Sequence, residues 1–201
     1  MTCLSLLTIY LRRFIRRNTA LPPHQFRASV SPPKDGTDAV QLPPLIDDAE
    51  TIVRAVKTPA HFDSKKRVIK AAAYKPPVGL SVISVMRQSA KDEQSATSDD
   101  YCKNKSAEVA GASYVGMLAI LAKSIRDNAC TLEDAPDDYL GHAHVDHGFP
   151  RPPENEPDSA EAVASLNERC KELLKASKQH LDPAPSEQGW KGAPLSLIPN
   201  N

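Results

Sequence analysis

The octapeptide LSVISVMR, residues 80–87, is the stretch that most clearly predicts a secondary structure. Three of its residues, Val82, Ile83 and Val85, are β-branched, and it lies between a Pro-Pro-Val-Gly turn and a polar loop. Because β-branched side chains fit the pleated surface of a sheet, the pattern predicts a buried strand. With the strand and helix patterns around it, this predicts an α+β fold with a small mixed sheet and packed helices.

A second apolar run, SYVGMLAIL at residues 113–121, follows a stretch over residues 103–110 that fits a helix. The run fits a central strand, in which Gly116 would let another backbone approach closely, or the first half of a longer helix. We favour the strand, followed by a short helix over residues 122–129.

Residues 158–181 predict a long amphipathic C-terminal helix. Asp158 and Glu161 form an N-terminal capping signature, and Asp182-Pro183 would end the helix. We expect its apolar face to pack on the domain or on a second chain. This face consists of Val163, Leu166, Cys170, Leu173, Ser177 and Leu181.

The region N-terminal to LSVISVMR also predicts a helix, ending at Thr58-Pro59. Asp47 and Glu50 have the spacing of a capping box. An apolar stripe at helical spacing follows, made of Ile46, Ala49, Ile52, Val53 and Val56. The next segment, KKRVIKAAAYKPP at residues 65–77, fits either a strand or a helical turn.

The 18 prolines of the 201-residue chain mark its boundaries, because they crowd near both ends. We expect a flexible linker over residues 18–44, a single α+β domain over residues 45–181, and a disordered Pro-rich tail over residues 182–201. Residues 1–17, MTCLSLLTIYLRRFIRR, predict a basic amphipathic helix or a non-native extension. Such a helix would contact a membrane surface or a partner.

Charge and cysteine content narrow the class of protein. Lys and Arg together number 25, as do Asp and Glu, so the chain lacks the overall basic excess that usually marks a nucleic-acid binder, although a local patch remains compatible. The four cysteines are scattered, which suits reduced thiols in a cytoplasmic protein better than a disulfide framework.

The stretch LGHAHVDHGFP, residues 140–150, holds three of the six histidines. Its His-x-His-x-Asp-His string resembles the metallo-β-lactamase superfamily, but the acidic segment before it and the short chain after it do not. A single zinc ion held by His142, His144 and His147 is the metal-site hypothesis, with an open fourth position for catalysis. The alternative is that these histidines are structural.

A metal-free site is a further hypothesis. If the sheet brought His61, Arg87 and His144 into one cleft, they would supply a base, an anion clamp and an acid. Such a set suits nucleotide or phosphodiester chemistry. The alternative is that His61 is a turn residue and Arg87 a solvated strand end.

The motifs R-x-V-K-T-P-x-H, A-A-A-Y-K-P-P, L-S-V-I-S-V-M-R and H-A-H-V-D-H-G occur in this order. Together they resemble a group of small bacterial proteins without a known activity. The resemblance covers residues 54–148, and it implies no reaction, although it favours His144 over its neighbours. It singles out Arg54, His61, Tyr74, Arg87, His144 and Gly148.

The sequence therefore predicts a soluble bacterial accessory or interaction protein with a protein partner. The alternative is a small hydrolase or nucleotide-processing enzyme that uses His61, Arg87 and His144, with or without zinc.

Overall fold

The computed structural model describes residues 42–43, 45–77, 80–149 and 159–197, all within one compact unit that begins at Asp38. Eight strands are present in this part of the chain: β1 (Thr51–Lys57), β2 (Phe62–Asp63), β3 (Val68–Ile69), β4 (Val82–Arg87), β5 (Tyr114–Leu121), β6 (Thr131–Asp134), β7 (His142–Asp146) and β8 (Lys178–Leu181). The helices are α2 (Ser98–Ala110), α3 (Ala122–Asp127) and α4 (Ala160–Ala176), with short 3-10 turns η1 (Ala71–Tyr74) and η2 (Gly111–Ser113).

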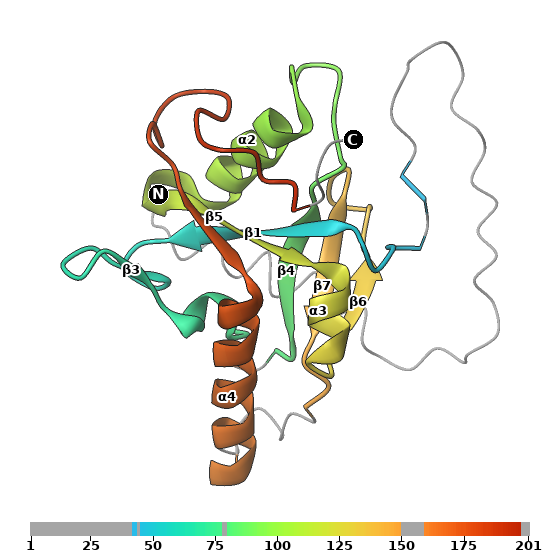
Figure 1. Cartoon of the computed structure of the whole chain (residues 1–201), viewed down its shortest axis with the longest axis vertical. Helices are drawn as coiled ribbons and strands as arrows, with labels where there is room; N and C mark the ends of the chain where they lie inside the picture. Colours follow the sequence, from blue (N-terminus) through green and yellow to red (C-terminus); the bar gives the residue numbers. More distant parts are fainter. Residues whose placement is uncertain (1–41, 44, 78–79, 150–158, 198–201) are drawn as a thin grey trace, which may run out of the picture. The chain divides into compact units, whose positions relative to one another are not determined.

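Six strands form one sheet in the order β6-β7-β4-β1-β5-β8, and all their pairings are antiparallel. The predicted α+β class is confirmed, and so are the strands at LSVISVMR and SYVGMLAIL, which are β4 and β5. β1 pairs with β5 along its whole length but with β4 only at Ile52–Arg87 and Val53–Met86. Beyond these pairs β1 and β4 diverge, and they run in very different directions in Figure 1.

The helix predicted over the first apolar stripe is wrong, because residues 51–57 form the central strand β1. Ile52 and Val56 belong to the core on one face of the sheet, and Val53 belongs to the core on the other. A strand buried on both faces loses the alternation of apolar and polar residues, and its apolar residues then also fit a helical spacing. Asp47 does not cap a helix but accepts the backbone N–H of Ala49 in a turn, at 2.8 Å.

One face of the sheet is covered by α3, α4 and η1 (Figure 1). The predicted apolar face of α4 is buried there through Leu166, Cys170 and Leu173. The helix begins after Ser159, whose hydroxyl accepts the backbone N–H of Ala162 at 3.1 Å.

The predicted C-terminal boundary of this helix is wrong. The helix ends at Ala176, and residues 178–181 form the edge strand β8, which pairs with β5. Gly116 permits this pairing, as predicted from its lack of a side chain. A Cβ atom at Gly116 would lie only 2.3 Å from the carbonyl oxygen of His180.

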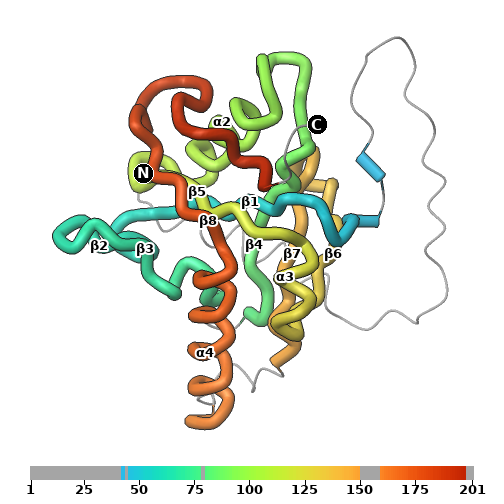
Figure 2. Tube along the Cα trace, in the orientation of Figure 1, coloured from blue at the N-terminus to red at the C-terminus, as the bar shows by residue number. Residues whose placement is uncertain are grey.

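The opposite face is covered by α2 and by the segment that follows β8, which runs along α2 in Figure 2. Backbone N–H groups of this segment donate to α2 side chains, among them Trp190 to Asp100 at 2.6 Å and Leu195 to Asp99 at 3.1 Å. The Leu195 side chain is completely buried. Residues 183–197 therefore pack on the domain, in contrast to the disordered tail expected there.

Residues 65–77 contain both of the predicted alternatives, a strand and a helical turn. The strand is β3, which pairs with β2, and the turn is η1, which follows it. Residues 1–17 and almost all of the predicted linker 18–44 lie outside the described residues. Among the helices that the structure describes, none is both long and apolar enough to cross a bilayer.

Candidate functional site

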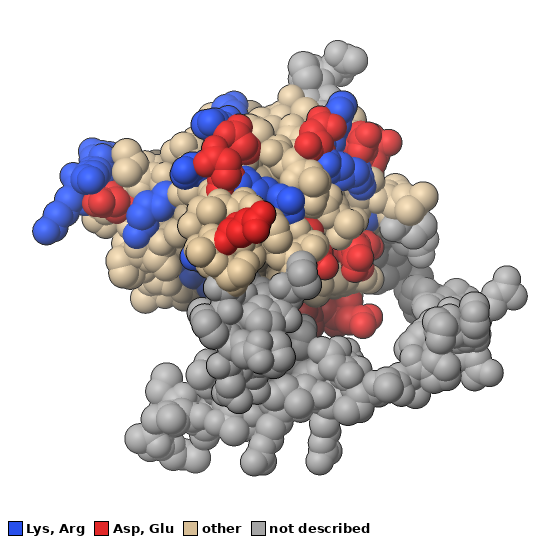
Figure 3. All heavy atoms as spheres, turned by 90° about the horizontal axis from the view of Figure 1, so that it is seen from below, with Lys and Arg blue, Asp and Glu red and all other residues tan. Residues whose placement is uncertain are grey.

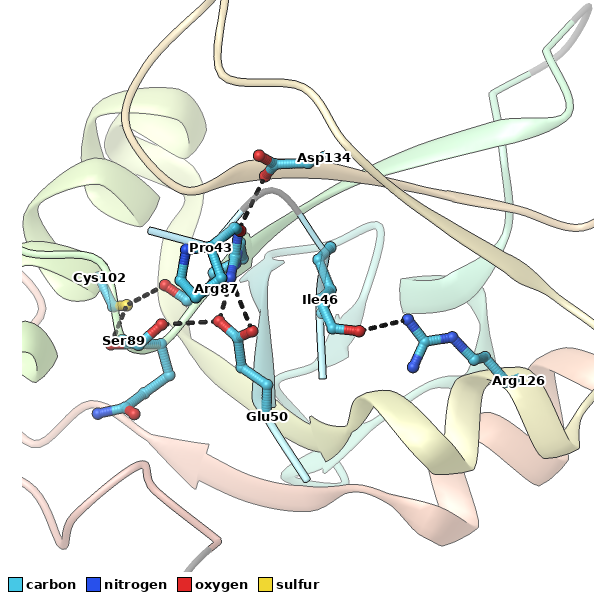
Figure 4. A network of polar contacts seen from close by, with 9 residues as sticks. Pro43, Ile46, Glu50, Arg87, Ser89, Cys102, Arg126 and Asp134 are labelled. Atoms are coloured by element: carbon cyan, nitrogen blue, oxygen red, sulfur yellow. Dashed lines mark hydrogen bonds and ion pairs between the residues drawn. The ribbon is translucent and has the colours of Figure 1, made fainter. Parts of the chain in front are cut away.

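Arg87, the predicted anion clamp, ends β4 and has only 1% of its side chain exposed. Its Nε and Nη2 donate to the two carboxylate oxygens of Glu50 at 2.8 and 2.9 Å, and its Nη1 donates to the carbonyl of Pro43 at 2.7 Å (Figure 4). Asp134 lies 3.4 Å from Nη1. Burial acts to lower the pKa of Arg87, but the neighbouring carboxylates outweigh it and the pKa is raised. Arg87 is thus held by protein groups and ties the start of β1 to β4 and β6.

The three histidines of LGHAHVDHGFP are divided between the two faces of the sheet. His142 and His144 point toward the α2 face, and their rings meet edge to face with centroids 4.7 Å apart. His142 also stacks on Tyr139, with the ring centroids 4.6 Å apart. His147 is buried on the other face, where its Nε2 lies 2.9 Å from the carbonyl oxygen of Tyr74.

The structure therefore does not bring the three predicted zinc ligands together. Alternation along an extended chain puts His142 and His144 on one face, but His147 is an odd number of residues away and enters the opposite core. Across the described ranges, no cluster of three or more His, Cys, Asp and Glu side chains could hold a metal ion.

His61 lies in the turn after β1 and is 9% exposed. Its Nδ1 accepts the backbone N–H of Lys57 at 3.3 Å. Burial is the main reason that its pKa is lowered to about 4, and the charge of Arg54 is the next. At neutral pH the ring is uncharged and accepts a hydrogen bond from a backbone N–H. His61 thus has the role of a turn residue, which was the alternative to a catalytic base.

The predicted group of His61, Arg87 and His144 does not meet in one cleft. His144 pairs with Ser84 across β4 and β7, and paired residues share a face. Arg87 is three residues from Ser84 on the same strand, so it points to the opposite face from His144. None of these three residues lines the hollow beneath α2, although Ser84, the pairing partner of His144, does.

The divergence of β1 and β4 leaves a small hollow beneath α2, which also includes apolar residues in its lining. It has a volume of about 30 Å³, enough for two or three water molecules at ~10–15 Å³ each. Its polar lining consists of Arg54, Lys57, Ser84, Lys105, Ser106 and Tyr139. These residues come from β1, β4, α2 and the loop before β7.

Arg54 occupies the gap between the two strands. Its Nε donates to the carbonyl of Ala73 at 3.1 Å and its Nη1 donates to the carbonyl of Ser84. The bond to Ser84 joins β1 to β4 where their backbones no longer pair, and the bond to Ala73 joins β1 to η1. No described carboxylate forms an ion pair with Arg54, and the groups that act on its charge are Tyr74 and Tyr139. Burial lowers the pKa of Arg54, because no described carboxylate offsets the cost of removing its charge from water.

Two lysines add to the positive charge of the hollow. Burial and the charge of Arg54 lower the pKa of Lys57. Lys105 contacts Glu108 at 2.7 Å, but that carboxylate is 68% exposed, and exposed pairs are weak. The lining includes three cations and no carboxylate. The hollow thus concentrates positive charge in a chain whose net charge is zero.

Sequence reasoning missed Lys57, Ser84, Lys105 and Tyr139, although the family resemblance included Arg54. A cation inside a buried strand was the available signal for Arg54, since charges rarely occupy such positions unless paired. Two further residues of the resemblance are structural. Tyr74 is buried and its hydroxyl lies 2.7 Å from that of Ser177, and Gly148 donates its N–H to Asp146 at 2.8 Å.

Chemically, the hollow offers guanidinium and ammonium donors, two serine hydroxyls and a phenol. Such groups suit an anion with several oxygen acceptors. Comparison with known proteins found no matching protein family, no matching curated protein and no matching solved structure.

Proposed function

We propose that this protein is an accessory module that binds a phosphate-bearing ligand, a nucleotide or a phosphodiester, in the hollow between β1, β4 and α2. The observation that carries the proposal is the lining itself, with three cations and no carboxylate. These cations are partly buried, and a partly desolvated cation is costly unless an opposite charge accompanies it, which a bound anion would supply.

Phosphate fits this lining better than a small spherical anion. Its oxygens can accept from a guanidinium fork and from two ammonium groups at once, and Arg54 already has a fixed orientation from its bonds to Ala73 and Ser84. At about 30 Å³ the hollow is too small for a whole nucleotide, so only a phosphate group would enter it. The rest of the ligand would lie outside it, past Tyr139 in the lining.

A cytoplasmic setting belongs to the same proposal. The three cysteines of the described residues, Cys102, Cys130 and Cys170, are all free and buried. Free thiols are typical of a reducing compartment, where nucleotides are also abundant.

The test is calorimetric titration of the protein with ATP and with inorganic phosphate at low salt. We expect ATP to bind, and we expect Lys57→Gln/Lys105→Gln to weaken it at least tenfold, because hydrogen bonds to charged groups contribute ~1.5–3 kcal/mol each. These lysines are chosen over Arg54 because the guanidinium of Arg54 also joins β1 to β4 and η1.

The matched control is Lys171→Gln/Lys175→Gln, which removes the same charge from the exposed side of α4. This variant should bind ATP as the wild type does. Equal affinities in the two double variants, or no binding of ATP and phosphate by the wild type, would refute the proposal.

A further inference from the structure

The β2–β3 hairpin carries a cluster of exposed cations at its tip. Lys65, Lys66 and Arg67 occupy the loop between the two strands, and all three are exposed. The Oδ1 atom of Asp63 accepts the backbone N–H groups of Lys65 and Lys66 at 3.0 and 3.1 Å. These bonds define the turn, so the three basic side chains are displayed by an ordered loop.

The charge of the hairpin is not neutralised by its surroundings. None of the three tip cations forms an ion pair with a described carboxylate, whereas the lysines of α3 and α4 pair with acids one turn away. Figure 3 shows Lys and Arg gathered at the projecting end, where Figure 1 has the hairpin. Residues 62–70 hold four cations and one carboxylate in a chain with 25 of each sign.

Two cations, Lys57 and Lys70, lie between the basic hairpin and the hollow. Lys57 lines the hollow and is the last residue of β1, from which the chain leads into the hairpin. Lys70 follows β3 and donates to the carbonyl of Pro59, in the turn between Lys57 and His61. The charges of Arg54, Lys57 and Lys70 all lower the pKa of His61, so these cations lie around one turn.

We infer that the basic hairpin and the hollow together bind a single strand of nucleic acid, with one phosphate in the hollow and neighbouring phosphates along the hairpin. This inference rests on the proposed function and names its ligand class. A free nucleotide needs only the hollow, whereas cations that continue along a projecting hairpin match a ligand with a series of phosphates. Tyr139 lines the hollow with one face of its ring stacked on His142, so an unpaired base would stack on the other face.

The test uses fluorescein-labelled oligothymidylate of 15 nucleotides and fluorescence anisotropy at several salt concentrations. We expect Lys65→Gln/Lys66→Gln/Arg67→Gln to lower the affinity at least tenfold. We also expect the negative slope of log K against log salt to become shallower by about 2, because each phosphate contact to a single strand contributes ~0.7 to its magnitude. The affinity of this triple variant for ATP should stay within about twofold of the wild-type affinity.

A matched triple variant, Lys123→Gln/Lys171→Gln/Lys175→Gln, removes the same charge from α3 and α4. The inference is overturned if this control loses as much oligonucleotide affinity as the hairpin variant. The inference is also overturned if the hairpin variant binds the oligonucleotide with wild-type affinity. The same holds if the hairpin variant loses binding only to vesicles of phosphatidylserine and phosphatidylcholine.

The two proposals fail separately. If ATP does not bind but oligonucleotide binding depends on the hairpin, the hollow is not a phosphate site and the joint site is overturned. If ATP binds through Lys57 and Lys105 while the wild type ignores the oligonucleotide, the proposed function stands and the strand inference falls.

Discussion

At the scale of single residues, His61 illustrates how the cationic neighbourhood acts on the fold. Its neutral ring accepts the N–H of Lys57, and the charges around it come from Arg54, Lys57 and Lys70. A proton on this imidazole would break the acceptor role and add a fourth positive charge. The folded protein therefore resists a protonation that the unfolded chain accepts.

This resistance predicts a pH-dependent stability. The pKa of His61 is about 4 in the fold against 6.5 for an ordinary imidazole, so the unfolded chain binds more protons in this window. The free energy of unfolding should fall as the pH drops from about 6.5 to about 4, by ~3 kcal/mol from this residue. Urea unfolding at pH 7, 5.5 and 4.5 measures the effect.

The matched variant is His61→Asn, whose side-chain oxygen can still accept from Lys57 but does not titrate. Its stability should fall less steeply over the same range. Parallel curves for the variant and the wild type would assign the acid sensitivity to other groups, such as His142, whose pKa is lowered by burial and by His144.

At the scale of elements, β8 depends on the missing side chain of Gly116. A Cβ atom there would lie 2.3 Å from the carbonyl oxygen of His180 and 2.9 Å from the Cα of Leu181, both backbone atoms of β8. We expect Gly116→Ala to destabilise the protein by about 3 kcal/mol, because overpacking at backbone atoms can be relieved only by moving the strand. Urea unfolding measures the loss.

Gly148→Ala is the comparison for this change. Gly148 has φ 63° and open space around its Cα, so the substitution adds only backbone strain, about 1 kcal/mol. A smaller loss at Gly116 than at Gly148 would mean that β8 shifts away from β5 without cost.

β1 and β8 also show which elements local patterns cannot predict. The apolar residues of β1 fit a helix because both faces of this strand are buried. β8 was read as the last turn of α4 because Leu181 continues the helical stripe, while pairing with distant β5 decides its conformation. β4, α3 and most of α4 were predictable, since their signals lie within their own residues, whereas the apolar run of β5 also fitted a helix.

The candidate site follows the same distinction. Strand alternation places His142 and His144 on one face, and this can be read from their spacing. The hollow could not be predicted, because Arg54, Ser84, Lys105 and Tyr139 come together only when β1 and β4 diverge beneath α2. Sequence spacing does not encode that divergence.

At the scale of the whole folded unit, the segment after β8 closes the core beneath α2. Leu195 is completely buried among Val53, Met86 and Met117, although it lies in a Pro-rich stretch. The anchoring bonds from Trp190 and Leu195 reach acids in the first turn of α2. The segment therefore links the end of the chain to the helix that also lines the hollow.

This arrangement predicts that Leu195 contributes to global stability as a core residue does. Leu195→Ala should lower the free energy of unfolding by ~2–5 kcal/mol, through lost burial and a new cavity. The control is Leu45→Ala, the same change at a side chain that is 84% exposed, which should cost less than about 0.5 kcal/mol. Chemical denaturation followed by circular dichroism compares the two. Equal costs would mean that the segment detaches in solution, and then the core beneath α2 would be open to solvent beside the hollow.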